Sequence, residues 1–294
     1  MGLDGGGTKT DCVLMDESGR VLGRGRGAAS NPSRIGIEVA ARGVQQAADA
    51  ALNDARLKME QVTAICAGLA GVAARERAAA MRDILTGFFT GRTLELCTDL
   101  DLALEAADAP VAIVLVAGTG SAAIGKREAR VARSGGHGPK GSDEGSAFSV
   151  GKHAVEAVKD TPRGEAHSLR ERIMHELGVE SVESILGLEG DAADAVYPRV
   201  FPLVASAADE GDEVARSLLH DAAKSLAGFV DVVQNELGAN SSAFLLGKTG
   251  GMVGRSNYFD DVLDAELRRV AANAKMEILR TPLAEVAARR ALRR

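Results

Sequence analysis

The chain has 294 residues, of which 35 are Lys or Arg and 41 are Asp or Glu, so its net charge is −6. Because nucleic-acid binders need a basic face for phosphate contacts, this acidic balance argues against that class of protein. Aromatic residues make up only 3% of the chain and Trp is absent. Base-stacking surfaces and aromatic sugar-binding shelves are therefore not expected.

Cysteine spacing and hydropathy indicate in which cellular compartment the protein is expected. Cys12, Cys66 and Cys97 lie too far apart in sequence for a CxxC pair or a zinc site, so we interpret them as reduced structural thiols. The first residues lack the basic and apolar regions of a signal peptide, and no stretch approaches about 18 consecutive apolar residues. We expect a cytoplasmic protein without a membrane partner.

Strands and helices alternate in the first part of the chain. Short apolar runs separated by turn residues over 1–27 predict two or three antiparallel strands. The predicted elements that follow are a helix over 33–57, a strand over 61–71, a helix over 74–89, a strand over 93–99 and a short helix over 100–107. This order is typical of an α/β fold with a mixed sheet.

The same pattern restarts after residue 110. Residues 111–126 and 129–136 indicate strand, glycine turn, strand and strand again. Residues 143–238 have helical periodicity, and we interpret Pro162, Pro198 and Pro202 as breaks between helices. The rest is predicted as a strand over 241–247, a helix, a strand over 276–280 and a last helix.

This repetition predicts a duplicated architecture with a cleft between two halves. We expect an N-terminal α/β domain over 1–110 and a C-terminal α/β domain with a helical insertion over 111–294. Whether the last helix packs back on the first domain is left open.

Three glycines separate the first two predicted strands. In Asp4-Gly5-Gly6-Gly7-Thr8 the turn carries no side chains, so backbone N–H groups can approach an anion closely. Thr8 adds a hydroxyl, and Asp4 could orient Mg²⁺ through water. An ordinary glycine-rich hairpin is the alternative, but the flanking Asp and Thr favour a phosphate site.

A second turn of this kind, Gly118-Thr119-Gly120-Ser121, lies between two strands of the second half. The pattern GTGS is weak evidence by itself because many tight turns contain it. Its position mirrors that of the first glycine turn, and two such turns can hold a polyphosphate from both sides.

Five motifs, in this order and spacing, resemble the N-acetylglucosamine kinase and BadF/BadG/BcrA/BcrD-type ATPase family of the actin, hexokinase and Hsp70 superfamily. They are DGGGTKT at 4–10, Thr98-Asp99, AGTGS at 117–121, GGHGPKGSDEGSA at 135–147 and LLGKTGGM at 245–252. The resemblance covers nearly the whole chain. It implies two ribonuclease-H-like (actin-like ATPase) domains with ATP and a sugar bound in a central cleft.

The resemblance also implies which residues bind the nucleotide. The residues expected at the phosphates of ATP are Gly5, Gly6, Gly7, Thr8, Lys9, Gly118, Thr119 and Gly120. Gly250 and Gly251 are expected near the adenosine, and Asp4 near Mg²⁺.

Asp99 is the candidate catalytic base. A carboxylate at the carboxyl end of a strand can accept the proton of a sugar hydroxyl as that hydroxyl attacks the γ-phosphorus, and the family has its general base at this position. A helix N-cap is the alternative interpretation of Asp99. Asp101 is the competing acid, which we expect to be solvated on the helix.

The resemblance implies a set of sugar contacts as well. It assigns Asn31, Gly136, Asp143 and Ala147 to the sugar, together with Asp99. His137 stands where relatives commonly carry Trp, and we interpret it as lining the pocket. Because the departures from the family pattern surround the acceptor, ATP use is better supported than the identity of the sugar.

These observations support an ATP- and Mg²⁺-dependent kinase for the 6-hydroxyl of N-acetylglucosamine or glucosamine, with a homodimer expected by analogy. The first alternative is a BadF-type ATPase that activates a partner redox enzyme, and the second is a nucleotide-binding sensor without turnover. The alternating Gly23, Gly25 and Gly27 and the sequence Gly247-Lys248-Thr249 match no complete nucleotide motif, so we interpret both as structural.

Overall fold

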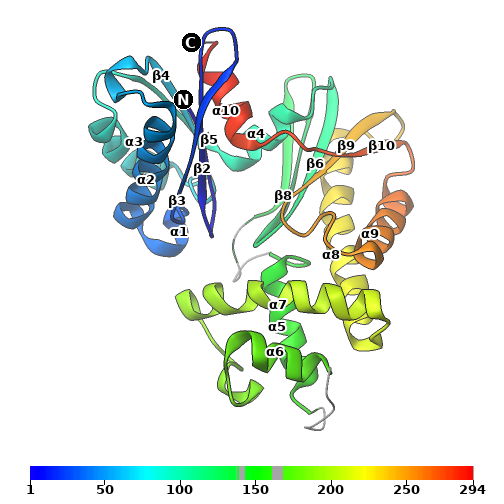
Figure 1. Cartoon of the computed structure of the whole chain (residues 1–294). Helices are drawn as coiled ribbons and strands as arrows, with labels where there is room; N and C mark the ends of the chain where they lie inside the picture. The colour runs from blue at the N-terminus through cyan, green and yellow to red at the C-terminus, as the bar shows by residue number, and fades with distance from the viewer. Residues whose placement is uncertain (137, 139–142, 161–167, 294) are drawn as a thin grey trace. The chain divides into compact units, whose positions relative to one another are not determined.

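The computed structural model describes all residues except 137, 139–142, 161–167 and 294. The chain divides into two compact units (Figure 1). Unit 1 consists of Met1–Ala106 with Arg280–Arg294, and unit 2 consists of Ala107–Leu279. Unit 1 is therefore built from two stretches of sequence, and unit 2 lies between them in the chain.

A five-stranded mixed sheet forms the centre of unit 1, in the order β3-β2-β1-β4-β5. Its strands are β1 (Gly2–Gly5), β2 (Thr10–Met15), β3 (Val21–Gly27), β4 (Ala64–Leu69) and β5 (Thr93–Thr98). The first three are antiparallel neighbours, whereas β1, β4 and β5 run parallel. Gly5 pairs with Leu69, and Leu69 pairs with Thr98, so the carboxyl ends of these three strands meet at one edge.

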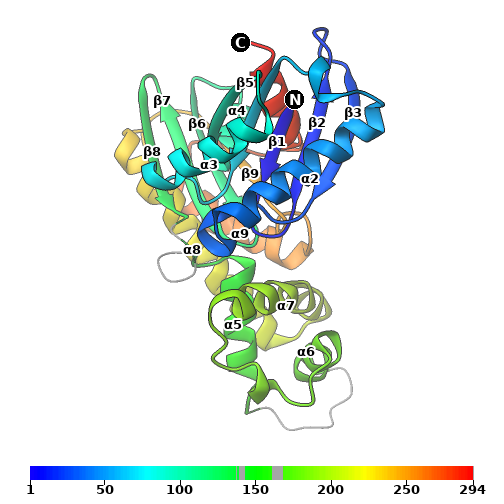
Figure 2. The same ribbon diagram turned by 90° about the vertical axis from the view of Figure 1, so that its left-hand side faces the viewer.

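Helices cover both faces of this sheet. They are α1 (Pro32–Ile35), α2 (Ile37–Ala55), α3 (Arg75–Phe88), α4 (Asp99–Ala106) and α10 (Leu283–Ala291), with a 3₁₀ turn over Met59–Gln61. Figure 2 shows α2 and α3 across the face that is turned to the viewer. α10 packs on β1, β2 and β4, and its Val286 and Ala287 share a cluster with Cys66.

One predicted helix, over 33–57, is divided in the structure. Gly36 has a φ of +80° between α1 and α2, a conformation that favours glycine and ends the first helix after one turn. The break orients α1 separately from α2. The prediction of a single helix was wrong because the spacing of apolar residues does not reveal an interruption at one glycine.

The alternating glycines of β3 allow α2 to approach closely. A Cβ on Gly25 would lie 2.2 Å from the carbonyl oxygen of Ala47 on α2, and Gly23 and Gly27 face the same helix in the same way. A Cβ atom at any of these positions would clash with the backbone of α2, so glycine is needed for the helix to pack on the strand. This agrees with our structural interpretation of the three glycines.

Unit 2 repeats the topology of unit 1. Its strands are β6 (Val111–Ala117), β7 (Ser121–Arg127), β8 (Arg130–Gly135), β9 (Phe244–Thr249) and β10 (Ala274–Ile278). The sheet order is β10-β9-β6-β7-β8, with β6, β7 and β8 antiparallel and β6, β9 and β10 parallel. Counted from the first strand of each unit, the two orders are the same. The predicted α/β fold class, with one mixed sheet repeated in the second half, is confirmed.

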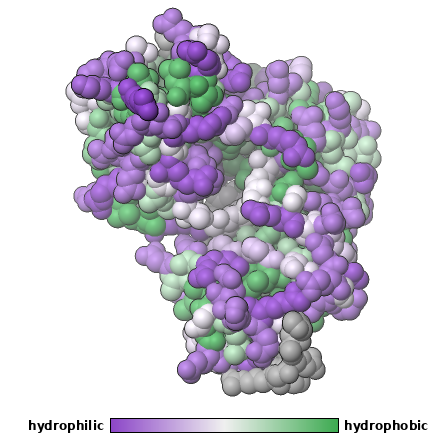
Figure 3. All heavy atoms as spheres, viewed as in Figure 1, coloured by the Kyte–Doolittle hydropathy of each residue, from purple (hydrophilic) through white to green (hydrophobic). Residues whose placement is uncertain are grey.

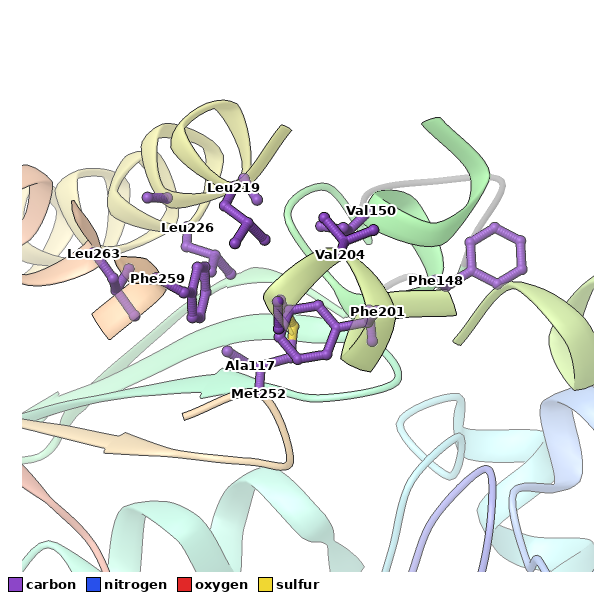
Figure 4. Close-up of a cluster of buried hydrophobic side chains, with 14 of the residues drawn as sticks. Ala117, Phe148, Val150, Phe201, Val204, Leu219, Leu226, Met252, Phe259 and Leu263 are labelled. Atoms are coloured by element: carbon purple, nitrogen blue, oxygen red, sulfur yellow. The ribbon is translucent and has the colours of Figure 1, made fainter. Parts of the chain in front are cut away.

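The helices of unit 2 pack on this sheet and on one another. They are α5 (Ala147–Val158), α6 (Leu169–Leu177), α7 (Gly190–Glu210), α8 (Glu213–Leu237) and α9 (Asn257–Val270), with a 3₁₀ turn over Val182–Ser184. Figure 4 shows Phe201 of α7 beside Phe259 of α9 and close to Met252. The rings of Phe201 and Phe259 meet edge to face, with centroids 5.9 Å apart.

Two prolines that we predicted to break helices lie inside one. Pro198 and Pro202 are both within α7, which continues for 21 residues. Tyr197 and Phe201, which directly precede the two prolines, are buried, and the rings of Tyr197 and Phe148 meet edge to face with centroids 5.4 Å apart. Burial of these aromatic residues offsets the hydrogen bonds that the prolines remove. Pro162 lies outside the described residues.

The face of the chain that Figure 3 shows is predominantly polar. On the face shown in Figure 3, hydrophilic residues surround small separate apolar areas. Within the described residues, no helix combines the length and the apolar character that crossing a membrane requires.

Candidate functional site

The glycine turn between β1 and β2 contains glycines of two kinds. A Cβ on Gly5 would lie 2.0 Å from the Ser30 hydroxyl oxygen, so packing requires a glycine there. Gly6 and Gly7 adopt no left-handed φ, and a Cβ on either would meet no atom closer than 3.6 Å. Neither conformation nor packing explains why these two residues have no side chain. That an anion approaches this bare backbone stays a prediction from the sequence.

Two backbone hydrogen bonds hold the turn, one within it and one from the loop after β3. The N–H of Gly6 donates to the carbonyl oxygen of Lys9 at 3.0 Å, and the N–H of Ser30 donates to the carbonyl oxygen of Gly6 at 3.0 Å. Lys9, expected at the phosphates, points its ammonium at Asp11, 2.5 Å away, and Arg26 contacts the same carboxylate at 2.8 Å. The structure thus gives Lys9 an acidic partner on β2.

Asp4 lies near the end of β1, paired with Asp11 on one side and Gly68 on the other. Burial raises the pKa of Asp4 to about 7, the carboxylates of Asp99 and Asp11 add to this effect, and Lys9 opposes it. The carboxylates of Asp4 and Asp99 therefore repel each other at this edge of the sheet. A bound cation would relieve this repulsion.

These carboxylates fit the coordination habits of Mg²⁺. The described residues contain no group of three or more His, Cys, Asp or Glu that could hold a metal ion. A Mg²⁺ ion that is held by one or two carboxylates, with phosphates and water as its other ligands, needs no such group. Asp4 is the residue that would orient it.

Asp99 begins α4 at the carboxyl end of β5. The helix is capped by its neighbours: the N–H of Asp101 donates to the Thr98 hydroxyl oxygen at 3.1 Å, and the N–H of Thr98 donates to the Asp101 carboxylate at 2.9 Å. This is a capping box with Thr98 as the N-cap. The alternative interpretation of Asp99 as the N-cap was therefore wrong, and Asp101 has a structural partner instead of being merely solvated.

Asn31 is the N-cap of α1, in the loop that follows β3. Its Oδ1 accepts hydrogen bonds from the N–H and the hydroxyl of Ser33, at 3.0 and 2.6 Å. The described part of the chain offers no acceptor to its Nδ2. A Cβ on Gly71, which has a φ of +83°, would lie 2.0 Å from Oδ1. Gly71 thus lets the loop after β4 pack on Asn31, a role that the sequence analysis did not assign.

In unit 2 the second glycine turn is joined to the start of α5. The N–H of Gly118 donates to the carbonyl oxygen of Gly120 at 3.0 Å, and the N–H of Ala147 donates to the carbonyl oxygen of Gly118 at 2.9 Å. The methyl group of Ala147 is buried in the core. Ala147, expected at the sugar, thus has its N–H and its side chain engaged within unit 2, where they hold the turn in place.

Asp143 lies against the same turn. It is 6% exposed, and a Cβ on Gly120 would lie 3.1 Å from its Oδ2. The hydroxyl of Ser121 donates to the carbonyl oxygen of Glu144 at 2.7 Å, so the DEGS segment and the GTGS turn form one structure. Thr119 is part of this turn.

Gly136 continues from β8 toward the same place. Its N–H donates to the carbonyl oxygen of Ser121 at 2.9 Å, and its own carbonyl oxygen accepts a hydrogen bond from Arg133 at 2.9 Å. The structure thus brings Gly136, Asp143 and the GTGS turn together. His137 lies outside the described residues.

The pair Gly250-Gly251 follows β9 and again combines two kinds of glycine. Gly250 has a φ of +110°, and a Cβ on it would lie 2.2 Å from the carbonyl oxygen of Ala117. A Cβ on Gly251 would meet no atom within 4 Å. Gly250 is therefore required by the fold, and Gly251 leaves a surface without side chains. Lys248 is 4% exposed and forms an ion pair with Asp264, as its structural interpretation requires.

The alternative of a redox-enzyme activator requires cysteines that hold an iron–sulfur cluster at a dimer interface. The three cysteines of this chain are poorly placed for that role. Cys12 and Cys66 are buried within β2 and β4, and Cys97 is half-buried in β5. Burial raises the pKa of the Cys12 thiol to about 12, which disfavours the thiolate that binds metals. The sulfurs of Cys66 and Cys97 lie 4.0 Å apart inside unit 1.

The chain is similar over most of its length to known proteins. The model of the BadF/BadG/BcrA/BcrD ATPase family matches residues 1–287. The N-acetyl-D-glucosamine kinase of Dictyostelium discoideum is 28% identical over 96% of this chain and 93% of its own length. The N-acetylmuramic acid/N-acetylglucosamine kinase of Clostridium acetobutylicum is 28% identical over 89% of this chain and 87% of its own length.

The fold has close counterparts among solved structures. A provisionally assigned N-acetylglucosamine kinase of Chromobacterium violaceum superimposes with a TM-score of 0.76 at 24% identity, covering 98% of this chain and 96% of the other. At this identity the likeness concerns the fold, and it extends over both units.

Proposed function

Because the chain belongs to the BadF/BadG/BcrA/BcrD ATPase family, we propose that it is an ATP-dependent amino-sugar kinase that phosphorylates the 6-hydroxyl of N-acetylglucosamine or glucosamine. Both curated relatives described above are kinases of amino sugars. ATP supplies the γ-phosphoryl group, and Mg²⁺ neutralises charge on the phosphates when it is bound.

The observation that carries this proposal is the placement of Asp99. The capping box between Thr98 and Asp101 anchors the first turn of α4, so Asp99 is held at the carboxyl end of β5. A fixed carboxylate at this edge can accept the proton of a hydroxyl while the oxygen attacks phosphorus. The new O–P bond forms as the bond between the γ-phosphorus and the bridging oxygen breaks, and ADP leaves with that electron pair.

The glycine turns supply the complementary part of the chemistry. Phosphoryl transfer depends mainly on positioning and on stabilising negative charge. The N–H groups of Gly6 and Gly118 are engaged within their turns, so the backbone N–H groups of Gly7 in unit 1 and of Gly120 in unit 2 would donate to the phosphates. Gly251 would lie near the adenosine.

The acceptor would be held by polar groups from both halves of the sequence. Asn31 has its Oδ1 engaged with Ser33, which leaves Nδ2 to donate to a sugar hydroxyl. Asp143 and Gly136 would contact further hydroxyls, and His137 would line the pocket. A cytoplasmic location and a homodimer belong to the same proposal.

The alternative, activation of a partner redox enzyme, is less well supported. Such activators hold an iron–sulfur cluster through cysteines at the dimer interface, whereas Cys12 and Cys66 are buried within strands here.

A coupled ADP-release assay tests the proposed function. The parent protein is assayed with N-acetylglucosamine, glucosamine, N-acetylmuramate and glucose, beside Asp99→Asn and, as a matched control, the exposed Asp83→Asn. We expect N-acetylglucosamine or glucosamine to stimulate ADP release, and Asp99→Asn to lower kcat about 10²- to 10⁴-fold. The 6-deoxy form of the sugar should not be phosphorylated. The proposal is wrong if no sugar raises ADP release above the basal rate, and the base is misassigned if Asp99→Asn keeps parental kcat.

A further inference from the structure

A cationic side chain that the motifs do not include lies against the first glycine turn. Arg34 is the third residue of α1, and its side chain runs beside Gly7. The position of a Cβ on Gly7 would be 3.6 Å from Nη1, 3.7 Å from Cδ and 3.9 Å from Cζ of Arg34. The guanidinium and the end of its aliphatic stem thus both border the open space beside the Cα of Gly7, where a side chain would otherwise lie.

The same helical turn connects Arg34 to the candidate sugar contact. Asn31 caps α1, and the backbone N–H of Arg34 donates to the carbonyl oxygen of Asn31 at 3.1 Å. Residues three apart lie on one side of a helical turn. Arg34 therefore joins the loop that carries Asn31 to the turn that carries Gly7, and in a kinase the transferred phosphoryl group passes from the phosphate site to the sugar.

The electrostatics of this edge favour a cation at that position. Asp4 lies opposite Asp11 in the pairing of β1 with β2, and Asp99 follows β5, which ends at the same sheet edge as β1. Lys9, the basic residue inside the glycine motif, makes an ion pair with Asp11. A polyphosphate that approaches these carboxylates needs positive charge to offset the repulsion, and Arg34 brings a cation to the glycine backbone itself.

We propose that Arg34 binds the γ-phosphoryl group of ATP and stabilises its charge during transfer. This inference rests on the proposed function and deepens it by adding a residue to the phosphate site. A guanidinium presents a planar fork of N–H donors that matches two phosphoryl oxygens, and it stays charged at all working pH values. No other bond changes are involved: the proton of the attacking hydroxyl still passes to Asp99.

Direct binding tests the inference without any turnover. Isothermal titration calorimetry compares ADP with AMPPNP, the ATP analogue that carries a γ-phosphoryl group, on the parent, Arg34→Gln, Arg34→Lys and the control Arg42→Gln from the exposed side of α2. Loss of one charge-assisted contact should weaken AMPPNP binding about tenfold in Arg34→Gln and leave ADP binding within about twofold. Arg34→Lys should recover part of the difference, and Arg42→Gln should match the parent.

Steady-state kinetics supplies the second readout. With the best sugar, Arg34→Gln should lower kcat about 10²-fold or more while the KM for the sugar changes little. The inference is overturned if ADP and AMPPNP lose affinity equally, or if neither does. It is also overturned if the variant is impaired only with N-acetylmuramate, because Arg34 would then read the carboxylate of that sugar. If the parent phosphorylates no sugar, the proposed function fails, and the ratio of the two nucleotide affinities still decides the role of Arg34.

Discussion

The carboxylate of Asp101 accepts two hydrogen bonds from Thr98, one from its backbone N–H at 2.9 Å and one from its hydroxyl at 2.7 Å. Thr98 in turn accepts the N–H of Asp101, so the two residues close a ring around the first turn of α4. Asp99 lies in the chain between Thr98 and Asp101, the two residues that form these hydrogen bonds. The orientation of the candidate base is therefore set by residues on either side of it.

Removing this cap should affect stability and catalysis together. Asp101→Ala leaves the N–H of Thr98 without its acceptor and should lower the free energy of unfolding by about 1 kcal/mol. It should also lower kcat more than it changes either KM, because Asp99 loses a fixed position. Asp101→Glu, the usual partner in a capping box, should restore much of both. Thermal unfolding and initial rates measure the two effects, and an Asp101→Ala variant with parental kcat would contradict this role.

The raised pKa of Asp4 predicts a pH-dependent stability. The folded-state pKa of about 7 lies above the ordinary value of 3.8, so folding takes up a proton between these values. The contribution of this group to stability is therefore fully present below about pH 4 and is lost as the pH rises through 7. Asp4→Asn removes that loss, so its Tm should exceed the parental Tm by a margin that grows from pH 4 to pH 7.

This measurement is made without nucleotide or Mg²⁺, because a bound cation would lower the pKa of Asp4. Asp83→Asn, on the exposed side of α3, should shift Tm equally at every pH. A margin for Asp4→Asn that is the same at pH 4 and pH 8 would show that the carboxylate is not destabilised by burial.

Substitution by Ala should affect stability at one glycine of unit 1 and ATP binding at another. A Cβ on Gly25 would lie 2.2 Å from the carbonyl oxygen of Ala47, so Gly25→Ala must push α2 away from β3 and should cost about 1–3 kcal/mol or more. The methyl group of Gly7→Ala would lie 3.6 Å from Nη1 of Arg34, an ordinary van der Waals contact, so this variant should keep the parental stability. It should still weaken ATP binding, because its methyl group stands where phosphate approaches. Equal affinity of parent and Gly7→Ala for ATP would place the phosphates elsewhere.

The last helix is tied to the segment that carries Asp99. Arg290 contacts Glu95 on β5 through Nε at 2.9 Å and Nη2 at 2.6 Å, and it reaches Glu105 on α4 at 3.4 Å. Arg290→Met should lower the free energy of unfolding of unit 1 by about 1–3 kcal/mol, since it removes the guanidinium that contacts both half-buried carboxylates, while Arg293 still contacts Glu105 at 2.7 Å. Arg289→Met, from the exposed side of the same helix, is the control. Equal Tm values for the two variants would mean that the ion pairs are as weak as exposed ones.

The parts of the site that sequence predicts best are those made of backbone. Gly6, Gly7 and the GTGS turn are visible in the sequence because consecutive glycines between two strands weaken the sheet unless the bare backbone is needed for close contact. Asp99 could be singled out as the candidate base, but its position in the capped turn could not. With two acids two residues apart, only the geometry shows that Asp101 completes the capping box.

Other features depend on contacts that no local pattern encodes. The position of Arg34 beside Gly7 joins residues 27 apart in sequence, and a lone Arg near an Asn-Pro turn carries no signal of its own. The persistence of α7 through Pro198 and Pro202 depends on aromatic residues buried against α5 and α9. Lys9 matched the family motif, yet its nearest partner is an acid on the neighbouring strand.

Unit 1 is completed only by residues that the ribosome makes after the whole of unit 2. A Cβ on Gly2 of β1 would lie 2.0 Å from the backbone nitrogen of Ala288, so α10 covers the central strand almost in backbone contact. Until α10 leaves the exit tunnel, the face of β1 and β2 that it covers has no partner, while unit 2 is already contiguous and free to fold. The order of folding should therefore reverse the order of the sequence, and nascent chains that stop before residue 280 should depend on chaperones to keep their N-terminal half from aggregating.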